Sequence, residues 1–119
     1  MKASENFLWS ELECKCGCGR KNVSPRAISK LQKMRDIVGS AFTINCAARC
    51  PVHNAKVGGA PRSQHRSTEI IQSTAFDISL SGHDKQEMIK AAEEAGFGGI
   101  GINYQTFIHV DDRGYRARW

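Results

Sequence analysis

The stretch Thr74-Ala-Phe-Asp-Ile-Ser-Leu80 is the clearest strand in the sequence, because apolar and polar side chains alternate along it. Phe76 and Ile78 fall on one face, and Asp77 falls on the other. The apolar face needs a hydrophobic core against it. We therefore expect a sheet that carries Asp77 on the face turned away from that core.

Residues 106–111 repeat this pattern near the end of the chain. Ile108 and Val110 face one way, and the other side chains face the opposite way: Phe107, His109 and Asp111. If the two strands are neighbours in one sheet, Asp77 and His109 converge on the polar face.

Two helices are marked by their ends. Ser24 is a suitable N-cap before Pro25, apolar residues follow at helical spacing, and Gly39 suits a left-handed C-cap. A second helix is expected to start after Asp84 and to end at Gly96. Each of these segments has one apolar stripe, which predicts packing against the core.

Shorter strands are expected at residues 41–45 and 99–104, and a long polar loop at residues 47–73. Strands and helices do not alternate regularly, so the predicted class is α+β, with a small, mainly antiparallel sheet flanked by helices. The 119 residues suit one domain, residues 1–119. Tyr104 and Trp119 are expected either to line a groove or to cover the core.

The predicted loop contributes His65, just before the strand that carries Asp77. Long loops in compact domains are usually functional. Two imidazoles and one carboxylate, from His65, His109 and Asp77, suit a tetrahedral zinc ion with a fourth position open to water. The alternative from spacing alone is that the histidines are hydrogen-bonded structural residues and that Asp77 forms a turn.

The composition of the chain limits the kinds of partner that we expect it to bind. Lys and Arg total 17 against 12 Asp and Glu, a net charge of +5, but the positive residues are scattered and not interleaved with aromatic ones. We therefore expect no nucleic-acid partner. No apolar run approaches the ~18 residues of a membrane span, and the first residues lack the features of a signal peptide. Membrane insertion and export by the usual route are not expected.

Five cysteines fall in two groups, the stretch Cys14-Lys-Cys-Gly-Cys-Gly19 and the pair Cys46 and Cys50. One interpretation is a structural zinc site with four thiolates drawn from both groups. The other is small buried residues that pack an N-terminal hairpin, with one redox-dependent bridge. The single residue between successive cysteines is tighter than in most zinc sites, and this favours the second interpretation.

Six motifs occur in order along the chain: Arg49-Cys-Pro-Val-His-Asn54, Val57-Gly-Gly-Ala60, Ser63-Gln-His65, Ala75-Phe-Asp-Ile78, Gly96-Phe-Gly-Gly-Ile-Gly101 and Phe107-Ile-His-Val-Asp111. Together they resemble the zinc peptidases of bacterial cell walls that include D-Ala-D-Ala carboxypeptidases and L-Ala-D-Glu endopeptidases, above all the short form found in bacteriophages. The resemblance spans Leu12 to Tyr115 and implies the fold shared with the hedgehog signalling domain.

The resemblance also implies roles for individual residues. His65, Asp77 and His109 match the three ligands of one catalytic Zn²⁺. Arg49 matches the arginine that binds substrate and stabilises the oxyanion, a role that suits a guanidinium with two donors. Ser63 matches a position near the substrate. Asp111 matches a catalytic acid–base residue, and its alternative role is to orient His109.

This chain departs from the family pattern at two places. The family usually has seven residues from the first histidine ligand to the aspartate, with a glycine between them. Here the separation is twelve and that glycine is missing. Well-studied relatives also carry an acidic residue where this chain has Thr106. Asp111 is the preferred substitute for it, and Glu69, in the extra residues, is a weaker candidate.

The resulting hypothesis is a zinc metallopeptidase that hydrolyses a peptidoglycan stem-peptide bond next to a D-amino acid, as a carboxypeptidase or an endopeptidase of the endolysin kind. It is expected to be a monomer, made in the cytoplasm, such as that of a phage-infected host, or carried in a virion. The alternatives are a non-catalytic cell-wall-binding or virion module that retains the fold, and a small cysteine–zinc module that binds nucleic acid.

Overall fold

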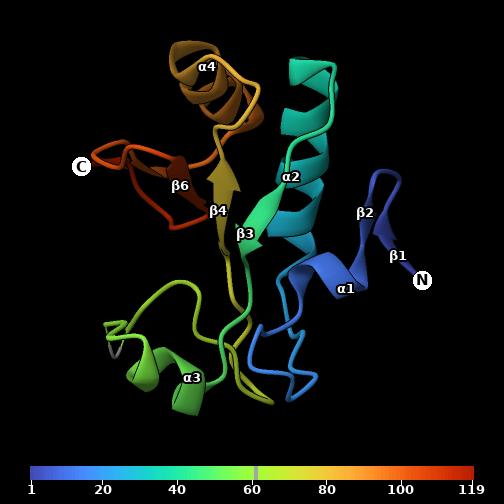
Figure 1. Cartoon of the computed structure of the whole chain (residues 1–119), viewed down its shortest axis with the longest axis vertical. Coiled ribbons are helices and arrows are strands. Elements are labelled where there is room, and N and C mark those ends of the chain that lie inside the picture. Colours follow the sequence, from blue (N-terminus) through green and yellow to red (C-terminus); the bar gives the residue numbers. More distant parts are fainter. Residues whose placement is uncertain (61) are drawn as a thin grey trace.

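The computed structural model describes residues 1–60 and 62–119 and shows four helices and seven strands within them (Figure 1). The helices are α1 (Trp9–Leu12), α2 (Pro25–Val38), α3 (Pro51–Lys56) and α4 (Lys85–Ala95). The strands are β1 (Lys2–Ser4), β2 (Phe7–Leu8), β3 (Ile44–Cys46), β4 (Ala75–Ser79), β5 (Gly99–Gly101), β6 (Phe107–Asp111) and β7 (Ala117–Arg118).

The main sheet has five strands in the order β3-β4-β6-β5-β7. All neighbours are antiparallel except β5 and β7. The two strands with the clearest alternation, β4 and β6, are adjacent at the centre, and β1 and β2 form a separate hairpin. The predicted α+β class with a mainly antiparallel sheet is therefore confirmed.

The core lies on one face of this sheet. Phe76, Ile78, Ile108 and Val110 are fully buried there, together with the apolar stripes of α2 and α4. Helix α2 begins as predicted, because the Ser24 hydroxyl accepts a hydrogen bond from a backbone N–H in the first turn. Among the residues described, no helix has both the length and the apolar character that a membrane crossing requires.

The edges of the fold differ from the sequence-based predictions. The strand expected at residues 41–45 lies at Ile44–Cys46, where its pairing with β4 is irregular, and the strand expected at 99–104 ends at Gly101. The loop expected at 47–73 contains α3, and residue 61 of that loop lies outside the described residues. Helix α3 has only six residues, too few for a recognisable apolar period.

We expect Phe76→Ala to lower the free energy of unfolding by about 3–5 kcal/mol, because the ring is completely buried and packs edge-on against Phe97. Urea unfolding followed by circular dichroism measures this loss. The matched control is Ile70→Ala, since Ile70 is 90% exposed. That variant should stay within about 0.5 kcal/mol of the parent. Equal losses in both variants would contradict this placement of the core.

Candidate metal centre

The polar face of the sheet brings together the two residues expected to meet there. Asp77 of β4 and His109 of β6 are directly paired in the antiparallel register. Asp77 Oδ1 lies 3.1 Å from His109 Nδ1. Gly101 of β5 is paired with His109 on the other side, so no bulky side chain crowds the imidazole from that strand.

His65 joins this pair from the segment between α3 and β4. Its backbone carbonyl accepts a hydrogen bond from the Arg49 N–H at 2.7 Å, which anchors the segment beside the end of β3. The buried imidazole has its Nδ1 2.8 Å from the Ala47 carbonyl and its Nε2 3.1 Å from Asp77 Oδ1. When Nδ1–H donates to that carbonyl, Nε2 is free to bind a metal ion.

The extra residues between His65 and Asp77 loop away from the site. Thr68 closes the loop, because its N–H donates to the Ile71 carbonyl at 2.9 Å. The Asn22 side chain then fastens the loop by donating to the Thr68 carbonyl at 2.8 Å. The twelve-residue separation therefore still allows His65 to contact Asp77.

The three residues offer donor atoms of the types that zinc binds. Each imidazole nitrogen lies 3.1 Å from the same carboxylate oxygen. In a tetrahedral zinc site with bonds of about 2.0–2.1 Å, neighbouring ligand atoms are about 3.3 Å apart. Cys46, which the sequence did not suggest for this site, lies with its Sγ 3.6 Å from His65 Nδ1. Ligand atoms of Cys46, His65 and Asp77 all lie within 4.8 Å of one another, so Cys46 is a further candidate ligand at this site.

Asp111 lies on the other side of the His109 ring. It is fully buried, and its Oδ2 accepts a hydrogen bond from His109 Nε2 at 2.7 Å. Arg113, which sequence reasoning missed, binds both carboxylate oxygens at 2.7 Å. The only signal for Arg113 was its place two residues after Asp111. Because both oxygens are engaged, the geometry favours the orienting role for Asp111 over proton transfer.

Gly99 explains how this buried ion pair fits beneath the site. Gly99 is paired with Asp111 across β5 and β6. A Cβ atom at this position would collide with the Asp111 carboxylate and with Arg113 Nε. The ion pair therefore occupies the space that a side chain at residue 99 would fill.

Arg49 and Ser63, the expected substrate-binding residues, are in contact. Arg49 Nη2 donates to Ser63 Oγ at 3.0 Å. Arg49 Nε is buried and has no hydrogen-bond partner among the described residues. A buried donor without a partner carries a desolvation cost, which the contact of Nη2 with Ser63 does not relieve.

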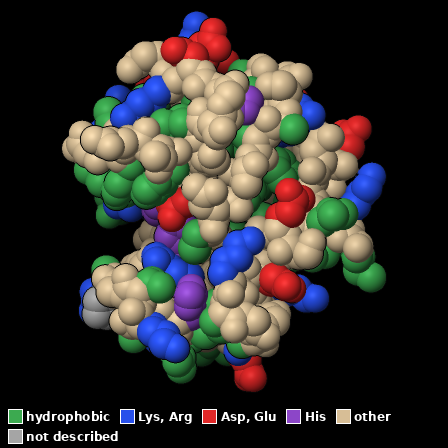
Figure 2. Space-filling view, in the orientation of Figure 1, with side chains coloured by type: hydrophobic (Ala, Val, Ile, Leu, Met, Phe, Trp, Pro, Cys, Tyr) green, Lys and Arg blue, Asp and Glu red, His purple; other side chains and the backbone are tan. Residues whose placement is uncertain are grey.

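These residues line a groove of about 620 Å³ that also includes His65, Asp77 and His109. Figure 2 shows the hollow between the part of the molecule that carries the sheet and the part that carries α3, with histidine, acidic and basic side chains gathered in it. Tyr104 and Trp119 lie on its wall and are joined by a 3.0 Å hydrogen bond. Of the two roles left open for them, lining the groove is correct.

The comparison with known families agrees with this arrangement. A sequence model of the Peptidase M15 family matches residues 5–111. The chain belongs to this family. The match covers strands β3 to β6, both long helices and every site residue predicted from the sequence, and it confirms the resemblance drawn from the six motifs. A search of curated proteins finds no significant match.

The charges of this M15 site are strongly coupled when no metal is bound. Burial opposes protonation of His65, but its contacts with Asp77 and Cys46 outweigh burial and raise its pKa to about 9. Burial likewise opposes ionisation of Asp77, yet the two imidazoles hold the pKa of its carboxyl well below the usual range. The pKa of His109 is raised against its burial by Asp111 and Asp77.

We expect the metal-free protein to lose stability as the pH rises from about 6.5 to about 9. The pKa of His65 is about 9 in the folded protein, above its ordinary value of 6.5. The charged pair with Asp77 therefore stabilises the fold fully below pH 6.5 and is lost as the pH passes about 9, a change on the order of 3 kcal/mol.

Urea unfolding of chelated protein across this pH range measures the change. His65→Gln is the matched control, because it removes the titrating ring and leaves the cysteines in place. The difference in stability between the parent and this variant should shrink with rising pH. A constant difference would contradict the assigned charge state.

Proposed function

We propose that this M15 protein is a zinc-dependent peptidase that hydrolyses a peptidoglycan stem-peptide bond next to a D-amino acid. The observation that carries the proposal is the convergence of His65, Asp77 and His109 in the groove that also contains Arg49. The proposal extends to either cleavage mode, carboxypeptidase or endopeptidase, and to action on the bacterial wall during lysis.

The chain fixes the orientation of the two proposed histidine ligands. Ala47 sets the ring of His65 through its carbonyl, and Asp111 sets the ring of His109 from the side opposite Asp77. When bound, zinc supplies Lewis acidity that polarises a carbonyl and lowers the pKa of a water molecule. Asp77, with its low carboxyl pKa, stays ionised and available as a ligand across the physiological range.

Arg49 is the residue best placed to hold the substrate. Its guanidinium is aligned by Ser63 and lines the groove. A guanidinium can donate two parallel hydrogen bonds to a carboxylate or to the oxygen that becomes negative during hydrolysis. Arg62 also lines the groove, which suits the carboxylate-bearing peptides of the bacterial wall.

Asp77 is the only carboxylate among the described residues that line this groove. Asp111 lies beneath His109 and is bound by Arg113, and Glu69 is exposed on the extra loop. We infer that Asp111 acts by orienting His109, as a positioning residue, although the sequence favoured it as the residue that moves a proton.

We expect His65→Ala to abolish metal-dependent hydrolysis, because it removes one of the three donors. The assay incubates purified peptidoglycan and synthetic stem peptides with zinc-loaded protein and identifies released D-alanine and fragments by mass spectrometry. His53→Ala is the matched histidine control, since His53 lies on α3 and outside the groove. Wall binding without hydrolysis in the parent would instead identify the non-catalytic module.

We expect Asp111→Asn to lower kcat/KM by about 10–100-fold, since the amide keeps part of the contact with His109 but loses the charge. The pH profile separates the two roles. If Asp111 is a positioning residue, the acidic limb of the pH–rate profile is the same in Asp111→Asn as in the parent, because the group that accepts the proton is unchanged. Loss of that limb would show that Asp111 moves the proton.

A further inference from the structure

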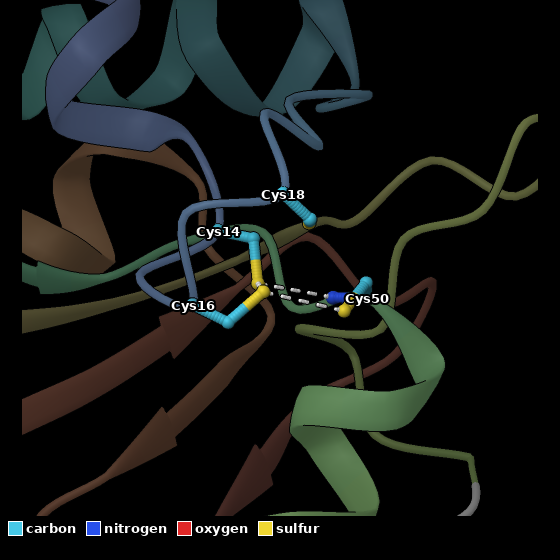
Figure 3. Close-up of side chains that lie close together, drawn as sticks. All are labelled: Cys14, Cys16, Cys18 and Cys50. Carbon is cyan, nitrogen blue, oxygen red and sulfur yellow. Dashed lines mark hydrogen bonds between the residues drawn. The ribbon is translucent and has the colours of Figure 1, made fainter.

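A second cluster of metal-binding side chains lies outside the groove. Cys14, Cys16 and Cys18 follow α1, and Cys50 immediately precedes α3. Figure 3 shows the four side chains reaching toward one another from these two segments. Their sulfur atoms all lie within 4.8 Å of one another. We propose that these four thiolates bind a second, structural zinc ion.

The spacing of the sulfur atoms matches such a site. Cys14 Sγ lies 3.4 Å from Cys16 Sγ, which lies 3.7 Å from Cys50 Sγ. Zinc–sulfur bonds of about 2.3 Å place neighbouring sulfurs of a tetrahedron about 3.8 Å apart. Cys14 Sγ also accepts a hydrogen bond from the Cys50 N–H at 3.4 Å, a contact that stabilises negative charge on sulfur.

The backbone explains how cysteines separated by single residues converge. Gly17 and Gly19 have φ angles of 86° and 81°, in the left-handed region that other residues rarely adopt. The chain turns back at each of them, and the Gly17 N–H donates to the Cys14 carbonyl at 3.3 Å. Tight spacing counted against a metal site in the sequence, but these two glycines make that spacing possible.

Packing alone does not account for the cluster. Cys14 is buried, as the packing interpretation predicted, but Cys16 and Cys18 are exposed. The packing interpretation is therefore wrong for these two residues.

Four thiolates around one zinc ion carry a net charge of −2. The stretch from residue 14 to residue 21 contains three basic residues and no acidic one: Lys15, Arg20 and Lys21.

The site would connect the N-terminal segment to the groove. Cys50 follows Arg49 directly in the chain, and the backbone of Arg49 is hydrogen-bonded to the segment that carries His65. It donates to the His65 carbonyl and accepts from the Ser67 N–H, each at 2.7 Å. An ion on Cys50 therefore fixes the segment that presents both Arg49 and His65.

Zinc counting in a background without the groove ligands tests the proposal. We expect the double variant His65→Ala/His109→Ala, purified under reducing conditions, to retain one zinc per chain by elemental analysis. Adding Cys18→Ser should reduce this to none, whereas adding Cys46→Ser should leave it at one. Cys18 is exposed, so serine replaces a surface thiol, and circular dichroism checks that the fold is kept.

Two further measurements need no cysteine substitution. Cobalt added to the metal-free double variant should give thiolate-to-metal charge-transfer absorption, and zinc should protect four thiols from alkylation. No zinc and no protection in the folded double variant would overturn the proposal, as would a disulfide among these cysteines in protein freshly purified without reductant. Because the groove ligands are absent from this background, its outcome is independent of peptidase activity.

Discussion

The pairing of Asp77 with His109 across β4 and β6 is the contact on which the rest of the site depends. Antiparallel register places both residues on one face and sends their apolar neighbours into the core. A slip of one residue would exchange the two faces, burying the polar pair and exposing the core side chains. The hydrophobic pattern of the strands thus fixes the position of the candidate metal ligands.

Further contacts fix the position of His109 on the side of its ring that faces away from Asp77. Asp111 fixes the far side of the His109 ring, Arg113 neutralises the buried Asp111, and Gly99 leaves the space that both need. A buried carboxylate without such a partner would carry a large desolvation cost. Three adjacent strands, β4, β6 and β5, therefore supply this pair and its support, and His65 joins them from the segment before β4.

The sequence predicted the elements with a strong period. Both long helices and the two central strands carry regular apolar spacing, and their register explains why Asp77 and His109 could be paired in advance. Helix α3 and strand β7 could not be predicted, because elements of six and two residues depend on tertiary contacts. The convergence of Cys50 with the N-terminal cysteines depends likewise on the folding of distant segments.

The length of the loop after His65 has little influence on the geometry of the site, because the loop is closed at its base. Its own Thr68–Ile71 contact closes it, and Asn22 holds it from outside the groove. Loop-closure entropy rises only slowly with length, so a segment closed at its base tolerates added residues. The exposed tip at Ile70 is thus a suitable position for grafting a foreign peptide, such as an affinity tag, onto a domain whose groove stays unchanged.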